Sequence, residues 1–323
     1  MVYPLKKLIN FYKVAYKIRR VETKISENYS EGKMRCPVHL SVGQEGVSAA
    51  FSGIVKKKDF AVSTHRSHSH FIGKGGDLKA MIAEIYGKKD GTSSGKAGSM
   101  HLSDLRVNFM GSSPIVGNII PIGAGLALSS QIKKENRITF VFLGEGAVEE
   151  GVFYETINFA SVKKLPVIFI CENNFFSVYS SLKWRQPKDR KIYKMVEKIG
   201  VKSLHGNGND ILESYEKIRF AYNQVKKNKT PYFLEFKTYR WLEHCGPFFD
   251  NYLNYRNLKE FEYWKKRDPL KILNKKILSK FPYASKILRN LEKKLDKEIN
   301  KAFVFAQNSK FPAKKTAYEK VYK

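Results

Sequence analysis

Two short apolar runs, separated by a helical pattern, stand out in the middle of the chain. Residues 138–143 and 167–171 are rich in β-branched and aromatic side chains, as buried parallel strands are. Between the two runs, apolar side chains recur at helical spacing: Val152, Phe153, Ile157 and Ala160. The pattern predicts a strand, a helix and a second parallel strand, which together form a βαβ unit.

The rest of the chain extends this pattern. Residues 4–31 carry apolar side chains on one face and predict an amphipathic helix. A short strand, a histidine-rich turn and a helix are expected over 59–76, and two strands around a helix over 201–238. Residues 257–323 are rich in lysine and predict a helical extension. Because no boundary interrupts residues 1–323, we expect one α/β domain with a mostly parallel sheet flanked by helices.

Segment 107–132 contains no charged residue, which is a first indication of a membrane helix. Its prolines, asparagines and glycines argue against a span and favour the wall of a buried cofactor site that runs into a core helix. Residues 1–16 interleave lysines with apolar positions, unlike a signal peptide. The three cysteines have no CxxC spacing and indicate neither a disulfide framework nor a zinc site. We therefore expect a cytoplasmic location and no membrane contact.

The formal net charge of +29 raises the question of a nucleic-acid partner. The lysines are scattered through every segment in pairs, without a dense patch that contains aromatic residues. A solvated basic surface explains this distribution better, so we expect no nucleic-acid binding, while an acidic partner subunit remains open.

Polar residues follow both strands of the βαβ unit. Glu145 lies between two glycines after the first strand, and Asn174 follows the second. The carboxyl ends of adjacent parallel strands meet at one edge, where carboxylate and amide oxygens suit Mg²⁺. The glycines let an anion approach the amides of Gly146 and Ala147, where we expect a helix to begin. The pattern favours a site for Mg²⁺ and a diphosphate; the alternative is a plain turn with a coincidental asparagine pair.

Three further segments carry candidate chemistry. Segment 64–70 holds three histidines and Arg66; without cysteine or acid partners it favours an anion site over zinc, with a polar surface turn as the alternative. The glycine-rich segment 95–101 could close over a phosphate, but it lacks the Walker lysine pattern. His244 follows a predicted strand on an irregular loop, as a mobile acid or base would, although a lone loop histidine is more often only exposed.

Together these motifs resemble the alpha subunit of the thiamine-diphosphate-dependent decarboxylating component of 2-oxo acid dehydrogenases, of the pyruvate and acetoin type. The resemblance covers about residues 5–270. It rests on motifs in a fixed order: His39-Leu40, Gly43-Gln44-Glu45, His65-Arg66-Ser67-His68, Gly98-Ser99-Met100-His101, Ile115-Val116-Gly117, Gly144-Glu145-Gly146, Leu165 to Phe169, Glu172-Asn173-Asn174 and Thr238-Tyr239-Arg240.

The resemblance implies a thiamine-diphosphate-binding fold and a role for individual residues. The implied magnesium ligands are Glu145, Asn174 and the carbonyl of Phe176. The implied cofactor-binding groups are His65, Arg66, the amides of Gly146 and Ala147, Asn174 and, for the aminopyrimidine, Val116. The implied catalytic residues are His244, near the reacting carbonyl, and His39, on the substrate side.

The resemblance also implies a reaction and partners. The reaction is oxidative decarboxylation of a pyruvate-like 2-oxo acid, or cleavage of acetoin, with acyl transfer to a lipoyl carrier. The family's activating glutamate belongs to a separate beta subunit, so we expect a heterotetramer of two alpha and two beta chains, served by a lipoyl-bearing acyltransferase.

The chain departs from the family's pattern at three positions. Glu145 is longer than the usual aspartate by one C–C bond, about 1.5 Å. Glu243 and Cys245 flank His244 where the family commonly has glycine and serine. These departures leave two alternatives open: a non-oxidative, transketolase-like decarboxylase or carboligase without a lipoyl partner, and a non-catalytic relative that has lost magnesium.

Overall fold

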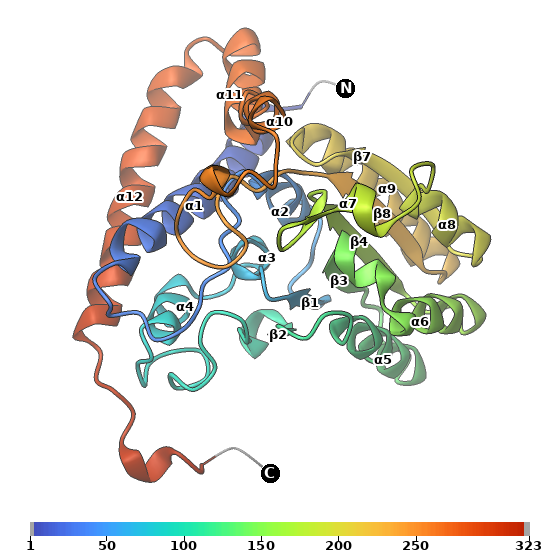
Figure 1. Ribbon diagram of the computed structural model, residues 1–323, viewed down its shortest axis with the longest axis horizontal. Coiled ribbons are helices and arrows are strands. Elements are labelled where there is room, and N and C mark those ends of the chain that lie inside the picture. Colours follow the sequence, from blue (N-terminus) through green and yellow to red (C-terminus); the bar gives the residue numbers. More distant parts are fainter. Residues whose placement is uncertain (1–2, 320–323) are drawn as a thin grey trace.

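The computed structural model describes residues 3–319 and contains a six-stranded parallel sheet flanked by helices (Figure 1). The strand order is β2-β1-β3-β4-β8-β7. The strands are β1 (Phe60–Thr64), β2 (Phe109–Ser113), β3 (Thr139–Gly144), β4 (Val167–Asn173), β7 (Lys202–Asn207) and β8 (Tyr232–Lys237). The predicted α/β class is confirmed, and the division into one domain stays a prediction. Residues 320–323 of the predicted C-terminal extension, and residues 1–2, lie outside the described residues.

Helices cover both faces of the sheet because successive side chains of the central strands point to opposite sides. On β3, Phe140 and Phe142 join one hydrophobic cluster, while Val141 and Leu143 join the other. The first cluster contains α1 (Leu5–Tyr29), α2 (Glu45–Ser52), α3 (His68–Lys74), α4 (Leu78–Ile85), α9 (Ile211–Asn228), α10 (Leu258–Lys265), α11 (Pro269–Lys280) and α12 (Ala284–Asn308). The second cluster contains α5 (Ile119–Ile132), α6 (Gly151–Val162) and α8 (Ile192–Lys198).

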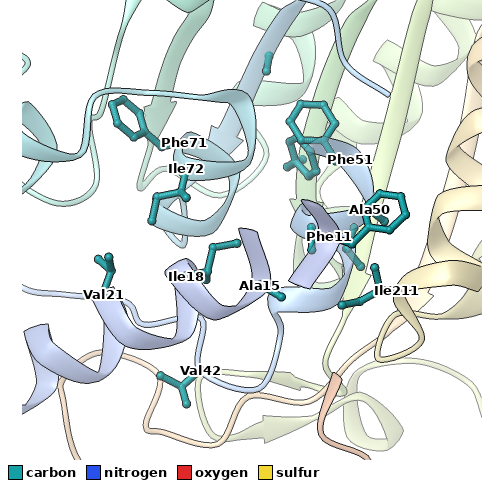
Figure 2. Packing of buried hydrophobic residues seen from close by; sticks show 14 of the residues in the cluster. Phe11, Ala15, Ile18, Val21, Val42, Ala50, Phe51, Phe71, Ile72 and Ile211 are labelled. Carbon is teal, nitrogen blue, oxygen red and sulfur yellow. The ribbon is translucent and has the colours of Figure 1, made fainter. Parts of the chain in front are cut away.

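Within the first cluster, the long helix α1 packs on α2 and α3. Figure 2 shows Phe11 and Ile18 of α1 on the side of the helix that faces α2 and α3, with Phe11 beside Ala50 of α2 and Ile18 below Ile72 of α3. Full burial of a side chain of this size contributes about 1.5–3 kcal/mol. Helix α12 runs along α1 at the side away from the sheet (Figure 1), so the C-terminal helices extend the core outward.

The charge-free segment continues into α5, which packs on β1 and β3. No helix within residues 3–319 is long and apolar enough to cross a membrane. The cytoplasmic location stays a prediction.

The order of the strands places a crevice at the carboxyl edge of the sheet. Strand β1 is adjacent to β3, and the connection after β1 leads to β2 on one side while the connection after β3 leads to β4 on the other. Ligands of open α/β sheets bind where such connections diverge. Strand β1 leads into His65, β3 into Glu145 and β4 into Asn174, so all three residues lie at this edge.

We expect Gly46→Ala to lower the free energy of unfolding by about 3 kcal/mol, because it overpacks a close helix contact. An alanine Cβ at position 46 would lie 2.0 Å from the backbone oxygen of Gly208. The matched control is Gly125→Ala in α5, where a Cβ meets nothing within 4 Å. That change should be neutral or stabilise by up to about 1 kcal/mol. Urea unfolding measures both variants, and equal stabilities would contradict the close packing of Gly46.

Candidate functional site

A cavity lies at the carboxyl edge of the sheet and encloses about 630 Å³ of empty space, part of it open to solvent. Small-molecule sites are typically concave and combine an apolar lining with a few convergent polar groups. All of the predicted site residues except His39 line it: His65, Arg66, Val116, Glu145, Gly146, Ala147, Asn174, Phe176 and His244. The fold therefore gathers residues from across the chain, while their binding roles stay predictions.

Glu145 is buried at the start of a 3₁₀ turn, Glu145–Glu149, that follows β3. The α-helix expected to begin here starts later, at Gly151, so Gly146 and Ala147 belong to the 3₁₀ turn. Burial raises the pKa of the Glu145 carboxyl above its usual range, against the opposing effects of Arg185 and of the backbone N–H groups of Glu145 and Asn174. The Asn174 amide thus links the ends of β3 and β4.

The two asparagines at the end of β4 make different contacts. Asn173 fixes the turn: its Nδ2 donates to Glu235 Oε1 at 2.8 Å, and its Oδ1 accepts from the Phe175 N–H at 3.1 Å. Asn174 lines the cavity, and its Oδ1 accepts from the Phe176 N–H at 3.1 Å. Phe175 adopts a left-handed φ of 69°, which sharpens the turn. The turn returns the chain to the cavity at Phe176.

Of the three histidines in segment 64–70, only His65 lines the cavity. His68 is buried between Ser99 and Glu22, at 2.8 Å from the Ser99 hydroxyl and 3.2 Å from the carboxylate. His70 is buried between two other polar groups and stacks on a core aromatic ring: its contacts are Ser63 Oγ at 2.7 Å, Glu172 Oε2 at 3.1 Å and the Phe142 ring. His68 and His70 therefore stabilise the turn through contacts within the protein, and these contacts do not support the zinc interpretation of this segment.

Three imidazoles from distant parts of the chain meet beside the cavity. The rings of His39 and His65 are 4.5 Å apart, and the ring of His244 lies 5.0 Å from the first and 5.2 Å from the second. Burial, reinforced by the charge of Arg66, lowers the pKa values to about 2 for His39, 3 for His65 and 2 for His244. All three rings are therefore neutral at physiological pH.

The three imidazoles each offer a nitrogen within 4.8 Å of the others, a spacing that could hold a metal ion. Arg66 is buried beside them and donates to the carbonyls of Leu40, at 2.6 Å, and His244, at 3.1 Å. Its fixed positive charge disfavours a cation there and favours an anion. The cavity wall near Arg66 therefore favours an anion over a metal ion, while Glu145 and Asn174 contribute oxygen atoms to the same cavity.

The loop that carries His244 is fixed by its own polar contacts. The Gly246 N–H donates to the Val38 carbonyl at 2.8 Å, which holds the loop against the strand-like segment at His39. Glu243 Oε1 accepts from the Phe248 N–H at 3.0 Å. The unusual glutamate at position 243 therefore closes the turn around His244.

The glycine-rich segment 95–101 does not line the cavity. The carboxylate of Glu84 accepts from four backbone N–H groups of this region, those of Ser93, Gly95, Ala97 and Gly98. These amides are already paired, so the phosphate-binding role considered for the segment is not supported.

Several residues of the site were not predicted with a role. Arg185 donates to Glu145, and Ser177, Gln44 and Glu172 line the cavity. Neither Gln44 Oε1 nor Glu172 Oε1, both buried, has a hydrogen-bond partner within residues 3–319. Gln44 and Glu172 stand in recognisable motifs, but Arg185 lies in a polar segment without a motif or periodicity to mark it.

Comparisons with known proteins agree with the geometry. Residues 13–315 match the family described as dehydrogenase E1 component. The chain is 37% identical to "Pyruvate dehydrogenase E1 component subunit alpha" of Rickettsia bellii (strain RML369-C), over 97% of this chain and 95% of the relative. It is 33% identical to "Pyruvate dehydrogenase E1 component subunit alpha, mitochondrial" of Solanum tuberosum, over 98% of this chain and 80% of the relative.

We expect the buried His39 to make the stability of the chain fall below pH 6.5. The pKa of His39 is about 2 in the folded chain and near 6.5 in the unfolded chain, so the unfolded state binds the proton first as the pH falls. The contribution is complete above pH 6.5 and is lost by up to about 1.4 kcal/mol per pH unit below it. His39→Gln should therefore flatten the pH profile of urea unfolding between pH 7.5 and 5, whereas His101→Gln, at an exposed histidine, should not. Parallel profiles for wild type and His39→Gln would contradict the buried, neutral ring.

Proposed function

Because the chain belongs to the dehydrogenase E1 component family, we propose that it is the alpha subunit of a thiamine-diphosphate-dependent dehydrogenase that oxidatively decarboxylates a pyruvate-like 2-oxo acid. The names of the relatives favour this reaction over the non-oxidative, transketolase-like alternative. The observation that carries the proposal is the convergence of Glu145, Asn174, His65, Arg66 and His244 on one cavity at the carboxyl edge of the sheet.

The residues present fit a diphosphate bound through a divalent cation. Glu145, Asn174 and the Phe176 carbonyl offer only oxygen donors, which suit Mg²⁺ and leave further positions for water and phosphate oxygens. Arg66 and the amides of the 3₁₀ turn, which line the same cavity, offer positive charge and N–H groups to an anion. We assign the diphosphate to Arg66 and these amides, and Mg²⁺ to Glu145, Asn174 and Phe176.

The remaining roles follow from position and charge. Val116 lies on the cavity wall and is half-exposed, and we assign its backbone to the aminopyrimidine edge. His244 and His39 are neutral, so each can donate a hydrogen bond from its ring N–H to the oxygen of a reacting carbonyl without adding charge. Thiamine diphosphate, when bound, supplies the carbon nucleophile and the electron sink for decarboxylation.

A beta subunit completes the site in this proposal. Ile115 and Val116 line the cavity and expose 65% and 48% of their surfaces, so the cavity wall presents apolar area to a partner. The relatives carry the word alpha in their names, which supports an enzyme of alpha and beta chains. We propose two of each, with a lipoyl-bearing acyltransferase as the acyl acceptor.

The reaction is tested by mixing the chain with its beta partner, thiamine diphosphate, Mg²⁺ and pyruvate. We expect CO₂ release coupled to reduction of an artificial electron acceptor, and acylation of an added lipoyl domain. Mass spectrometry of the lipoyl domain provides the second readout. Carboligation products without lipoyl acylation would contradict the oxidative reaction and support the transketolase-like alternative.

The metal is tested by Glu145→Gln, which keeps the shape of the side chain and removes its charge. We expect at least about a hundredfold weaker binding of Mg²⁺ in the presence of thiamine diphosphate, because a buried carboxylate supplies the anionic ligand. Isothermal titration calorimetry of the complex with the beta partner measures the affinity, and Glu150→Gln, at an exposed position of the same loop, is the control. Absence of metal-dependent heat in the wild type would support the non-catalytic relative instead.

A further inference from the structure

The Glu145 carboxylate is already engaged by a positive charge of the same chain. Arg185 Nη2 donates to Glu145 Oε1 at 2.8 Å. The side chains of the two residues expose 13% and 2% of their surfaces, respectively, so the ion pair is largely buried. Such a pair is costly to break when one partner is left alone.

A short segment after β4 delivers Arg185 to this position. The chain turns at Phe176, forms the small hairpin β5 (Phe176–Ser177) and β6 (Ser180–Ser181), and ends in one helical turn, α7 (Leu182–Arg185). Figure 1 shows this segment above the carboxyl ends of β3 and β4. The segment contains Phe176, a proposed cation ligand, so Arg185 and the cation site are joined by a short stretch of chain.

The guanidinium and a divalent cation would compete for the same carboxylate oxygen, Glu145 Oε1. A cation ligand distance is about 2.1 Å, and the Arg185 nitrogen is 2.8 Å from the same oxygen. The two positive charges would then lie within a few ångströms of each other in a buried site, where their repulsion is weakly screened. Repulsion between the two charges therefore favours withdrawal of the guanidinium when the cation binds.

A second carboxylate, that of Glu149, can hold the guanidinium after it leaves Glu145. Arg185 Nη1 also donates to Glu149, at the other end of the 3₁₀ turn, and Gln186 Nε2 donates to the same Glu149 oxygen at 3.0 Å. The Glu149 side chain is 28% exposed, so an ion pair there costs less desolvation than one at Glu145. Withdrawal to Glu149 leaves no charge without a counter-ion.

We propose that Arg185 competes with the divalent cation for Glu145 and that cation binding leaves the guanidinium on Glu149 alone. Arg185 thereby sets the affinity of the site for the metal. The inference rests on the proposed function, because it takes Glu145 as the cation ligand. The proposal predicts that the segment from Phe176 to Gln186 moves when the cofactor binds.

The test uses the complex of the chain with its beta partner, with thiamine diphosphate present and Mn²⁺ as the probe. The electron paramagnetic resonance signal of free Mn²⁺ reports binding. We expect Arg185→Gln to bind Mn²⁺ about tenfold more tightly than the wild type, and Arg185→Lys to fall between them. The matched control is Arg190→Gln, which removes the same charge from an exposed position nearby and should leave the affinity unchanged. Unchanged or weaker binding by Arg185→Gln would overturn the proposal.

Glu149→Gln gives the opposite change. It removes the second carboxylate for Arg185, so Mn²⁺ binding should weaken about tenfold in the wild-type background. In the Arg185→Gln background the same substitution should have a much smaller effect, and the difference between the two effects measures the coupling. Equal effects in both backgrounds would contradict the transfer to Glu149.

Glu145→Gln separates a failure of this proposal from a failure of the proposed function. If Glu145→Gln binds Mn²⁺ as the wild type does, the cation site itself is wrong. If it loses binding while Arg185→Gln is unchanged, only the competition is wrong. Thermal unfolding is a second readout: Mn²⁺ with thiamine diphosphate should raise the Tm of Arg185→Gln more than that of the wild type, and an equal rise would overturn the competition.

Discussion

The buried carboxylate of Glu145 is the constraint on which the site depends. It lies at the carboxyl edge of a parallel sheet, where burial raises the pKa of its carboxyl group, and positive charge or N–H groups must compensate it when ionised. Arg185 supplies the charge, and the backbone amide of Asn174 adds a hydrogen bond. A divalent cation bound with a diphosphate can supply the same compensation, so one constraint explains both the internal ion pair and the proposed cofactor site.

The part of the cavity near Arg66 carries the complementary, positive charge. Arg66 is buried and fixed by two backbone carbonyls, and its charge helps keep His39, His65 and His244 neutral. A site with one permanent positive charge and three neutral imidazoles can receive an anion and still place uncharged hydrogen-bonding groups at a reacting carbonyl. The proposed cation ligands and the proposed anion ligands thus line one cavity.

The sequence was sufficient for the fold class and for the edge where the site lies. Buried strands produce apolar runs that are visible in a single sequence, and residues that follow such runs meet at one edge of a parallel sheet. The family resemblance, confirmed by the match over residues 13–315, supplied the roles of individual residues. Side-chain contacts between distant residues leave no comparable pattern in the sequence. Neither the pairing of Arg185 with Glu145 nor the capture of the segment 95–101 by Glu84 could be foreseen, because each joins positions unrelated by any sequence period.

The most direct measurement is a crystal structure of the complex with the beta partner, thiamine diphosphate and Mn²⁺, with the cation located by its anomalous scattering. We expect the anomalous peak about 2.1 Å from oxygens of Glu145, Asn174 and the Phe176 carbonyl, with Arg185 paired to Glu149 only. A peak at the three histidines, or a cation at Glu145 with Arg185 still on the same carboxylate oxygen, would contradict the account.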